Sequence, residues 1–321
     1  MRLLAAALAA WLCMLSVPTH AQPAPKEIVT LASPAKPWSF VMSRDGRIGA
    51  AVCADYQLRV WTMADGRSLP SIDLGKREIY SMTISPDGRM LVAGDFAGEY
   101  SFWQTATGTE QAHLRLRFYP QAMAFSADGS RLAIAPIGEP VQVYDAATHQ
   151  KLFELQRRVG GTAALAFSRD GSRLLAADAD TVVRIYDART GTLLRSNTEF
   201  LLEPLTAAFS ADGREVMTGG GDKFVATIDA ATGRTTKKSG KMDDPVVTLD
   251  VSPDGAWVAT LLMHADNLTM PAPVIVTEAA TGRRVSQWLP AKLAMWTGWT
   301  GDGRLLLATG EPDGVHIWRV R

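Results

Sequence analysis

Histidine is the side chain that most often acts as a general acid, a general base or a metal ligand near neutral pH, and here it is rare and scattered. Beyond the N-terminal segment the sequence has His113, His149, His264 and His316, and no pair shows the His-x-x-x-His spacing of a metal site. The surrounding segments predict a strand, a turn, a loop and a strand that do not converge. We therefore predict no catalytic residue, no metal site and no cofactor.

Acidic residues recur near one turn of the repeated unit described below, an arrangement that resembles an anionic ring. Turn formation explains the series, because Asp side chains bind nearby backbone N–H groups in turns. The series is Asp55, Asp95, Glu139, Asp180, Asp222 and Asp313. Asp243 and Asp244 also pair two carboxylates, but neighbours on a strand point to opposite faces, which disfavours shared acid and base work.

Four aromatic residues are stronger candidates, for binding rather than for catalysis. Trp38, Tyr80, Tyr119 and Trp296 each lie at or near the start of an apolar, strand-like segment. Trp and Tyr bring a large contact area at low entropic cost, so they are enriched at binding hot spots. If the segments form a circle, the four rings would make an arc around its central mouth and contact a partner. The alternative is that they pack between neighbouring segments.

The second candidate for partner contact is an insertion at residues 264–273, which lengthens one copy of the repeat. Within it, His264, Asp266 and Asn267 are the polar side chains that we expect to face a partner. The alternative is an insertion that the fold merely tolerates, since lengthening a surface loop costs little free energy.

An internal repeat supplies the elements that would position these residues. A Ser/Thr-x-Asp-Gly element occurs seven times, with Asp-to-Asp separations of 42, 41, 42, 42, 42 and 48 residues. The aspartates of the seven copies are Asp45, Asp87, Asp128, Asp170, Asp212, Asp254 and Asp302. The last and longest separation contains the insertion.

Each copy predicts four antiparallel strands. The residue directly before the Ser/Thr is bulky, and the second residue before it is small in most copies. This alternation is typical of a strand with two different faces. Asp-Gly then predicts a tight turn, because Gly adopts positive φ without a Cβ clash. A third strand ends in a large residue, and an Ala-x-Thr-Gly-like turn follows. His149 replaces the Gly of one copy, which predicts either strain or a different turn there. Seven such units predict an all-β, seven-bladed β-propeller.

The two ends of the chain predict how the ring closes. The last copy stops after its third strand, near Ile317, and a spare strand-like segment, residues 27–31, precedes the first copy. We expect this segment to pair as the outer strand of the seventh blade, which removes a free sheet edge. Deleting residues 22–33 should therefore destabilise the whole ring.

The units resemble WD40 repeats. Tyr144-Asp145 and Tyr186-Asp187 stand in the place of the Trp-Asp dipeptide, whereas Trp61, Trp103 and Trp318 keep the aromatic residue and lose the acid. The Gly-His dipeptide of that family is missing from all seven copies, so the buried His-to-Asp network is not carried over. The resemblance is specific for fold rather than for function.

The resemblance covers about residues 27–321 and implies a binding face. This is the end of the ring with the connections between strands four and one and between strands two and three. We expect a non-catalytic protein-interaction or scaffold propeller, with a protein as its partner. Exported propellers also include lactonase-like hydrolases and quinone-dependent dehydrogenases, so an exported enzyme or cofactor protein is the alternative.

The N-terminus predicts export. Met1 and Arg2 are followed by an apolar run, residues 3–17, and Ala21 ends a small-residue cleavage site. The run is short for a membrane span and no second one follows, so we do not expect a membrane-spanning protein. We predict a cleaved signal peptide at 1–21, a propeller at 22–321 and a bacterial periplasmic location.

Charge and cysteine content bound the partners. Basic and acidic residues balance at 33 each, which argues against nucleic acid as a partner. Removal of the signal peptide would leave Cys53 as the single cysteine, so no internal disulfide can form. We expect Cys53 to be a small buried hydrophobic residue and the propeller to be monomeric.

Overall fold

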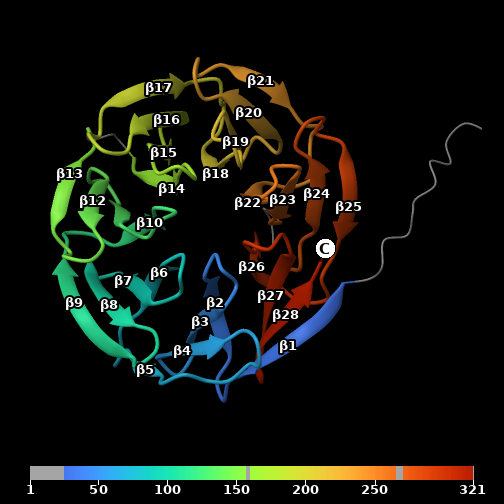
Figure 1. Cartoon of the computed structure of the whole chain (residues 1–321). Coiled ribbons are helices and arrows are strands. Elements are labelled where there is room, and N and C mark those ends of the chain that lie inside the picture. The colour runs from blue at the N-terminus through green and yellow to red at the C-terminus, as the bar shows by residue number, and fades with distance from the viewer. Residues whose placement is uncertain (1–24, 157–159, 265–269, 321) are drawn as a thin grey trace, which may run out of the picture.

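The computed structural model describes residues 25–156, 160–264 and 270–320. The expected signal peptide, and Asp266 and Asn267 of the expected contact loop, lie outside the described residues. The predicted fold class is confirmed: 28 strands form seven four-stranded antiparallel sheets, and none of the described residues is helical. Figure 1 shows the sheets as blades around a common centre, with the first strand of each blade innermost.

The strands of each blade follow one another along the chain. Blade 1 has β2 (Pro37–Met42), β3 (Ile48–Cys53), β4 (Gln57–Thr62) and β5 (Ile72–Asp73). Blade 2 has β6 (Ile79–Ile84), β7 (Met90–Asp95), β8 (Glu99–Gln104) and β9 (Thr109–Arg115). Blade 3 has β10 (Pro120–Phe125), β11 (Arg131–Pro136), β12 (Gln142–Asp145) and β13 (Lys151–Glu154). Blade 4 has β14 (Thr162–Phe167), β15 (Arg173–Asp178), β16 (Val182–Asp187) and β17 (Leu193–Asn197).

The remaining blades keep this pattern until the ring closes. Blade 5 has β18 (Pro204–Phe209), β19 (Glu215–Gly220), β20 (Val225–Asp229) and β21 (Thr235–Lys238). Blade 6 has β22 (Val246–Val251), β23 (Trp257–Leu262), β24 (Val274–Glu278) and β25 (Arg284–Trp288). Blade 7 has β26 (Ala294–Trp299), β27 (Leu305–Glu311) and β28 (Gly314–Arg319), and its outer strand is β1 (Lys26–Ala32).

The repeated Ser/Thr-x-Asp-Gly element forms the same turn in every blade. In blade 1, the Ser43 hydroxyl donates to Asp45 at 2.6 Å, the Gly46 N–H donates to the Ser43 carbonyl at 2.9 Å, and the Ile48 N–H donates to Ser43 Oγ at 3.0 Å. Gly46 has a φ of +70°, which a side chain would strain. The turn therefore depends on all three residue types of the motif.

The core is divided among the seven interfaces between blades. One cluster joins Leu58 and Val60 of blade 1 to Leu91 and Trp103 of blade 2, and the other clusters likewise take residues from two adjacent blades. A single blade leaves apolar side chains on both faces, so it is stable only between two neighbours. Cys53 is buried in the cluster between blades 7 and 1, as predicted.

The predicted closure of the ring is confirmed. β1 pairs antiparallel with β28, from Lys26 opposite Arg319 to Ala32 opposite Gly314. Figure 1 shows β1, in blue, lying along β28, in red. Leu31 of this strand is fully buried, so β1 contributes to the core as well as covering a sheet edge.

Of the two alternatives expected at the third-blade turn, a different turn and a strained one, the strained one is present. His149 has a φ of +59°, in the left-handed region that the corresponding glycines of the other blades occupy at low cost. Its ring packs edge-on against Phe102 of blade 2, with centroids 4.8 Å apart. This contact offsets part of the cost of the backbone conformation.

Candidate functional site

Alternation of strand direction gives the ring two chemically different ends. The loop end carries the connections between strands two and three and between successive blades, such as residues 96–98 and 74–78. The turn end carries the Ser/Thr-x-Asp-Gly turns and the connections between strands three and four, such as residues 43–47 and 105–108. Loops on a rigid scaffold are the usual place for binding residues.

Three aromatic rings form a cluster at the loop end. The rings of Tyr80 and Tyr119 have centroids 4.5 Å apart, and Phe96 lies 5.0 Å from Tyr80 and 5.4 Å from Tyr119. Tyr80 and Phe96 are 44% and 54% exposed, although large aromatic residues usually bury most of their surface. Sequence reasoning missed Phe96; the signal was an aromatic residue inside a turn, where polar residues are expected.

The four aromatic candidates do not form a single arc, and β-bulges explain why. Every inner strand has a register shift that leaves its second residue unpaired, and Trp38 and Tyr80 occupy this bulge in blades 1 and 2. Trp296 is the third residue of its strand and pairs with Ala308. It packs edge-on against Phe40, with centroids 5.9 Å apart, and lines the central channel instead.

Most exposed large hydrophobic side chains lie at the loop end. Twelve such side chains are exposed in the described part of the chain, and eight of them lie in loop-end connections or at the adjoining strand starts. The eight are Trp38, Tyr80, Phe96, Leu201, Leu202, Met270, Leu289 and Leu293. The other four lie on outer strands and none lies in a turn-end connection, so apolar exposure distinguishes the two ends of the ring.

The described part of the blade-6 insertion is anchored by His264. Its Nδ1 lies 2.7 Å from an Asp244 carboxylate oxygen and its Nε2 lies 3.1 Å from the Pro271 carbonyl oxygen. Both ring nitrogens thus face acceptors, which holds the imidazole in one orientation. His264 therefore fixes the base of the insertion, while Met270 is 50% exposed.

Arginine side chains hydrogen-bond to acidic residues near two loop-end turns. In blade 2, Arg77 Nε donates to Asp95 at 2.7 Å, and Arg77 Nη1 donates to Ser101 Oγ at 2.9 Å. In blade 4, Arg184 Nη1 donates to Asp178 at 2.6 Å; burial raises the pKa of Asp178, and its hydrogen bonds with Thr162 and Arg184 offset part of this effect. Asp95 of the acidic series also accepts from the Ala97 and Glu99 N–H groups at 2.9 Å, in agreement with the turn interpretation of that series.

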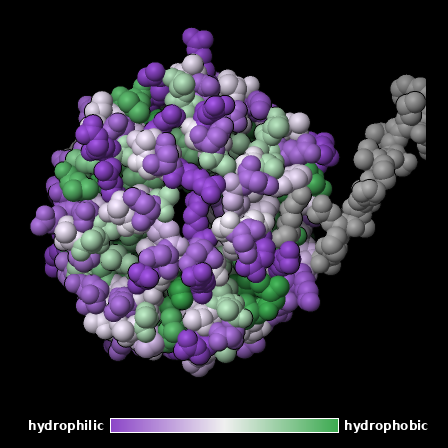
Figure 2. All heavy atoms as spheres, in the orientation of Figure 1, coloured by the Kyte–Doolittle hydropathy of each residue, from purple (hydrophilic) through white to green (hydrophobic). Residues whose placement is uncertain are grey.

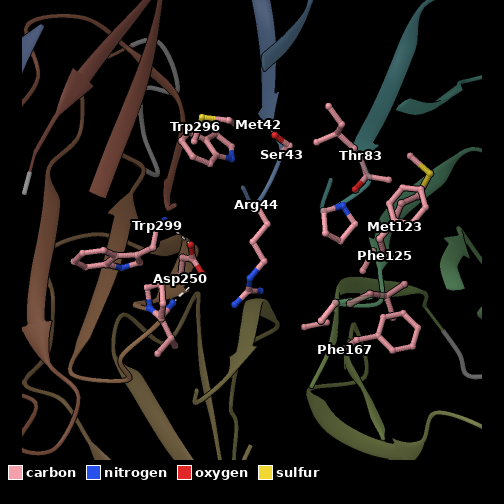
Figure 3. Close-up of a pocket in the computed structure, with 18 residues that line it drawn as sticks. Met42, Ser43, Arg44, Thr83, Met123, Phe125, Phe167, Asp250, Trp296 and Trp299 are labelled. Atoms are coloured by element: carbon pink, nitrogen blue, oxygen red, sulfur yellow. Dashed lines mark hydrogen bonds between the residues drawn. The ribbon is translucent and has the colours of Figure 1, made fainter. Parts of the chain in front are cut away.

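The centre of the ring contains a cavity of about 410 Å³, lined by residues of the inner strands and of the adjoining Ser/Thr-x-Asp-Gly turns. Figure 3 shows Arg44 reaching into it, with Trp299 and Asp250 on one wall and Phe125 and Phe167 on the other. Figure 2, which has the orientation of Figure 1, shows hydrophilic side chains gathered over the centre of the ring. The cavity thus combines an apolar wall with separate charged groups.

Asp250 is the acid of this cavity. Its carboxylate accepts hydrogen bonds from the N–H groups of Trp299 at 2.7 Å and Val251 at 2.9 Å. Burial raises the pKa of Asp250, and the hydrogen bond from Trp299 and the charge of Arg44 oppose that effect. No ion pair joins Arg44 to Asp250, and the described residues include no other acidic side chain that lines this cavity.

The histidines remain dispersed in the structure. His113 contacts Glu99 at 2.6 Å, and His316 contacts Glu27 at 2.7 Å in a different blade. No three His, Cys, Asp or Glu side chains of the described residues come together as a possible metal site.

Nor do the described residues include a helix that is long and apolar enough to cross a membrane.

Comparison with known proteins agrees with this architecture. Residues 157–187, which end at the third strand of blade 4, match the family model described as "WD domain, G-beta repeat". The chain is also 25% identical over 111 residues to WD repeat-containing protein SL1-17 of Schistosoma mansoni, an alignment that spans 34% of this chain and 37% of that protein.

Repeat, fold and matches together show a WD40-like seven-bladed β-propeller. Propellers of this type generally mediate protein interactions, so the fold suggests an interaction scaffold.

Proposed function

We propose that this chain is an exported protein-interaction module that acts outside the cytoplasm, in a bacterial periplasm, and holds a protein partner at its loop end. The single observation that carries this proposal is the uneven distribution of apolar surface. Eight of twelve exposed large hydrophobic side chains of the described residues lie at that end, and the turn-end connections have none. Exposed apolar groups on an otherwise polar surface are typical of interaction sites.

The cluster of Tyr80, Phe96 and Tyr119 is the expected hot spot. Its rings already contact one another at 4.5 to 5.4 Å, so little side-chain entropy is lost when a partner covers them. Covering a large aromatic side chain stabilises a complex more than covering most other residues. Trp38 of the neighbouring blade, which is 52% exposed, would extend the contact.

The partner contact is tested by a matched pair of double variants. Tyr80→Ser with Phe96→Ser removes the proposed hot spot, and Leu193→Ser with Leu194→Ser removes two other exposed apolar side chains, on an outer strand. All four residues are exposed, so both variants should fold with stability within about 0.5 kcal/mol of the parent per site. A chemical cross-linker applied to the natural host, followed by purification of the propeller, identifies the partner.

The first variant should lower the affinity for the cross-linked partner by at least about tenfold, and the second should leave it within about twofold. Equal losses in the two variants, or no loss in the first, would contradict the proposed contact surface. Purified components and calorimetry give the comparison.

Export is tested separately. The N-terminal pattern of a positive start, an apolar run and a small-residue site supports a cleaved signal peptide at 1–21. Leu8→Arg places a charge in the middle of the apolar run and should retain the full-length protein inside the cell. The parent chain should be recovered outside the cytoplasm with Gln22 as its first residue; recovery of uncleaved protein inside would oppose the proposal.

A further inference from the structure

The central cavity lies at the end of the ring opposite the proposed partner surface. It is bounded by the inner strands and by the Ser/Thr-x-Asp-Gly turns, and has a volume of about 410 Å³. A second lobe of about 210 Å³ adjoins it and shares Arg44 and Asp250 with it. The volume of the main lobe is in the range of small-molecule sites, about 300–1,000 Å³.

The repeat itself shows which lining residues depart from what the fold requires. The second residue before the Ser/Thr of each turn is Val41, Thr83, Ala124, Ala166, Ala208, Asp250 or Gly298. The residue after the Ser/Thr is Arg44, Pro86, Ala127, Arg169, Ala211, Pro253 or Gly301. Six blades fold without an acid at the position of Asp250, and five fold without a charge at the position of Arg44 and Arg169. The fold therefore does not require these three charged residues.

Backbone capping does not account for the charge on Asp250. The inner strands have an open edge, and side chains of one blade cap N–H groups of the next. The Gln121 amide oxygen accepts from the Thr162 N–H at 3.0 Å, and the Thr206 hydroxyl accepts from the Leu249 N–H at 3.0 Å. Neutral side chains thus perform this task elsewhere, whereas a carboxylate carries a desolvation cost.

Gly298 makes room for the acid and for the neighbouring aromatic wall. A Cβ at this position would lie 3.2 Å from Asp250 Oδ2 and 2.6 Å from Trp296 Cζ2. The Trp299 ring packs between blades 6 and 7 with Ala259 and Leu305. This wall therefore combines an acid with the Trp296 indole.

Arg44 is the cation of the cavity and is free to bind. Its guanidinium has no hydrogen bond or ion pair with another described residue, whereas Arg169 donates to the Pro253 carbonyl at 2.9 Å across the turn end. Figure 3 shows Arg44 extended between the two walls. A guanidinium with an unused fork of donors is suited to a carboxylate.

We propose that this cavity binds a small zwitterionic molecule of the apolar amino-acid class. Its carboxylate pairs with Arg44, its ammonium group with Asp250, and its apolar body packs against Trp296 and the facing Met123 and Phe125 side chains. Two opposite charges that do not pair with each other fit a ligand that carries both signs. A ligand with only an acid would place a second negative charge near Asp250.

The test uses calorimetry of the purified propeller with leucine, methionine, phenylalanine and tryptophan. Two single-charge analogues of phenylalanine, 3-phenylpropionate and 2-phenylethylamine, share its apolar body. At least one amino acid should bind with a Kd of about 1 mM or tighter. If phenylalanine binds, each of its two analogues should bind at least about tenfold more weakly than phenylalanine.

Two variants locate the site and one controls for it. Arg44→Met and Asp250→Asn should each weaken the amino acid by at least about tenfold. Arg47→Met removes an arginine of the same turn whose side chain is 83% exposed outside this cavity, and should change the affinity by less than about twofold. If Asp250→Asn does not fold, Arg44→Met decides, because Arg44 is an exposed residue.

The proposal is overturned if no amino acid of the panel binds up to about 10 mM, or if Arg44→Met binds as the parent does. Equal affinity for an amino acid and its single-charge analogue also overturns it. Phe96 does not line this cavity, so the loop-end variant Phe96→Ser should bind the amino acid as the parent does. That result separates this proposal from the proposed partner contact.

Discussion

Arg184→Met is the perturbation whose cost the structure determines most directly. Arg184 donates to Asp178 at 2.6 Å and to Asp180 at 2.9 and 2.6 Å, and the side chains of Arg184 and Asp178 are only 9% and 2% exposed. Methionine retains the apolar stem but leaves Asp178 with the Thr162 hydroxyl, 2.6 Å away, as its remaining side-chain donor. An unpaired buried charge of this kind costs about 3–5 kcal/mol of unfolding free energy near pH 7.

Blade 1 supplies a matched control for this variant. Arg59 makes the same two-pronged contact with Asp55, four residues earlier, at 2.8 and 2.6 Å, but Asp55 is 37% exposed and Cys53 stands where blade 4 has Asp178. Arg59→Met should therefore cost only about 1 kcal/mol, because the Asp55 carboxylate that it leaves unpaired remains accessible to water. The comparison isolates the second, buried acid.

The pH dependence gives the sharper test. Burial raises the pKa of Asp178, so the folded protein binds this proton more tightly than the unfolded chain, and stability falls as pH rises through the folded pKa. Without Arg184 that pKa rises further, so the gap between parent and variant should widen with rising pH. Urea unfolding followed by tryptophan fluorescence and circular dichroism measures both. A gap that is the same at acid and neutral pH, or a loss equal to that of Arg59→Met, would refute the reasoning.

Three further predictions concern closure and strain. Leu31→Ala should lower the free energy of unfolding, measured in urea, by about 2–5 kcal/mol because Leu31 is fully buried. Gly314→Ala should lower it at least as much, since the added Cβ would lie 2.2 Å from the Leu31 carbonyl oxygen. Burial lowers the pKa of His316, but hydrogen bonds and charge from Asp313 and Glu27 raise it overall, so protonated His316 stabilises the folded protein. This contribution to the unfolding free energy should be present below about pH 6.5, fade as pH rises, and be absent in His316→Gln. His149→Val should lower stability by about 1–2 kcal/mol while His149→Asn changes it little, because φ is +59°; equal melting temperatures would oppose this.

The fold could be predicted because one turn recurs with a fixed period. Ser43, Asp45 and Gly46 each have a separate task in that turn, so the motif is specific even though neighbouring residues vary. The closing strand followed from the same period, since one copy lacked its fourth strand and one strand preceded the first copy. Both inferences rest on backbone geometry, which residue type controls strongly at turns.

The aromatic surface could be predicted only in part, because a bulge shifts the direction of a side chain by one residue. Tyr80 lies in the bulge and Trp296 one place beyond it, so residues that look equivalent along the sequence lie in different places. The contact between Tyr80 and Phe96 joins a strand to a turn that follows it by a dozen or more residues. No local pattern specifies such a pair.

A ring of seven copies allows each position to be compared with six others in the same molecule. Where a residue type recurs in all copies, the fold accounts for it; where only one or two copies have a charged group in a low-dielectric place, its desolvation cost requires a compensating partner. Asp95 and Asp178 occupy the same strand position in blades 2 and 4, and each has an arginine partner. The Asp250 carboxylate accepts from backbone N–H groups alone and has no ion pair with Arg44. The acids therefore differ in kind: Asp95 and Asp178 are paired within the chain, whereas Asp250 is the acid that the proposed zwitterionic ligand would pair.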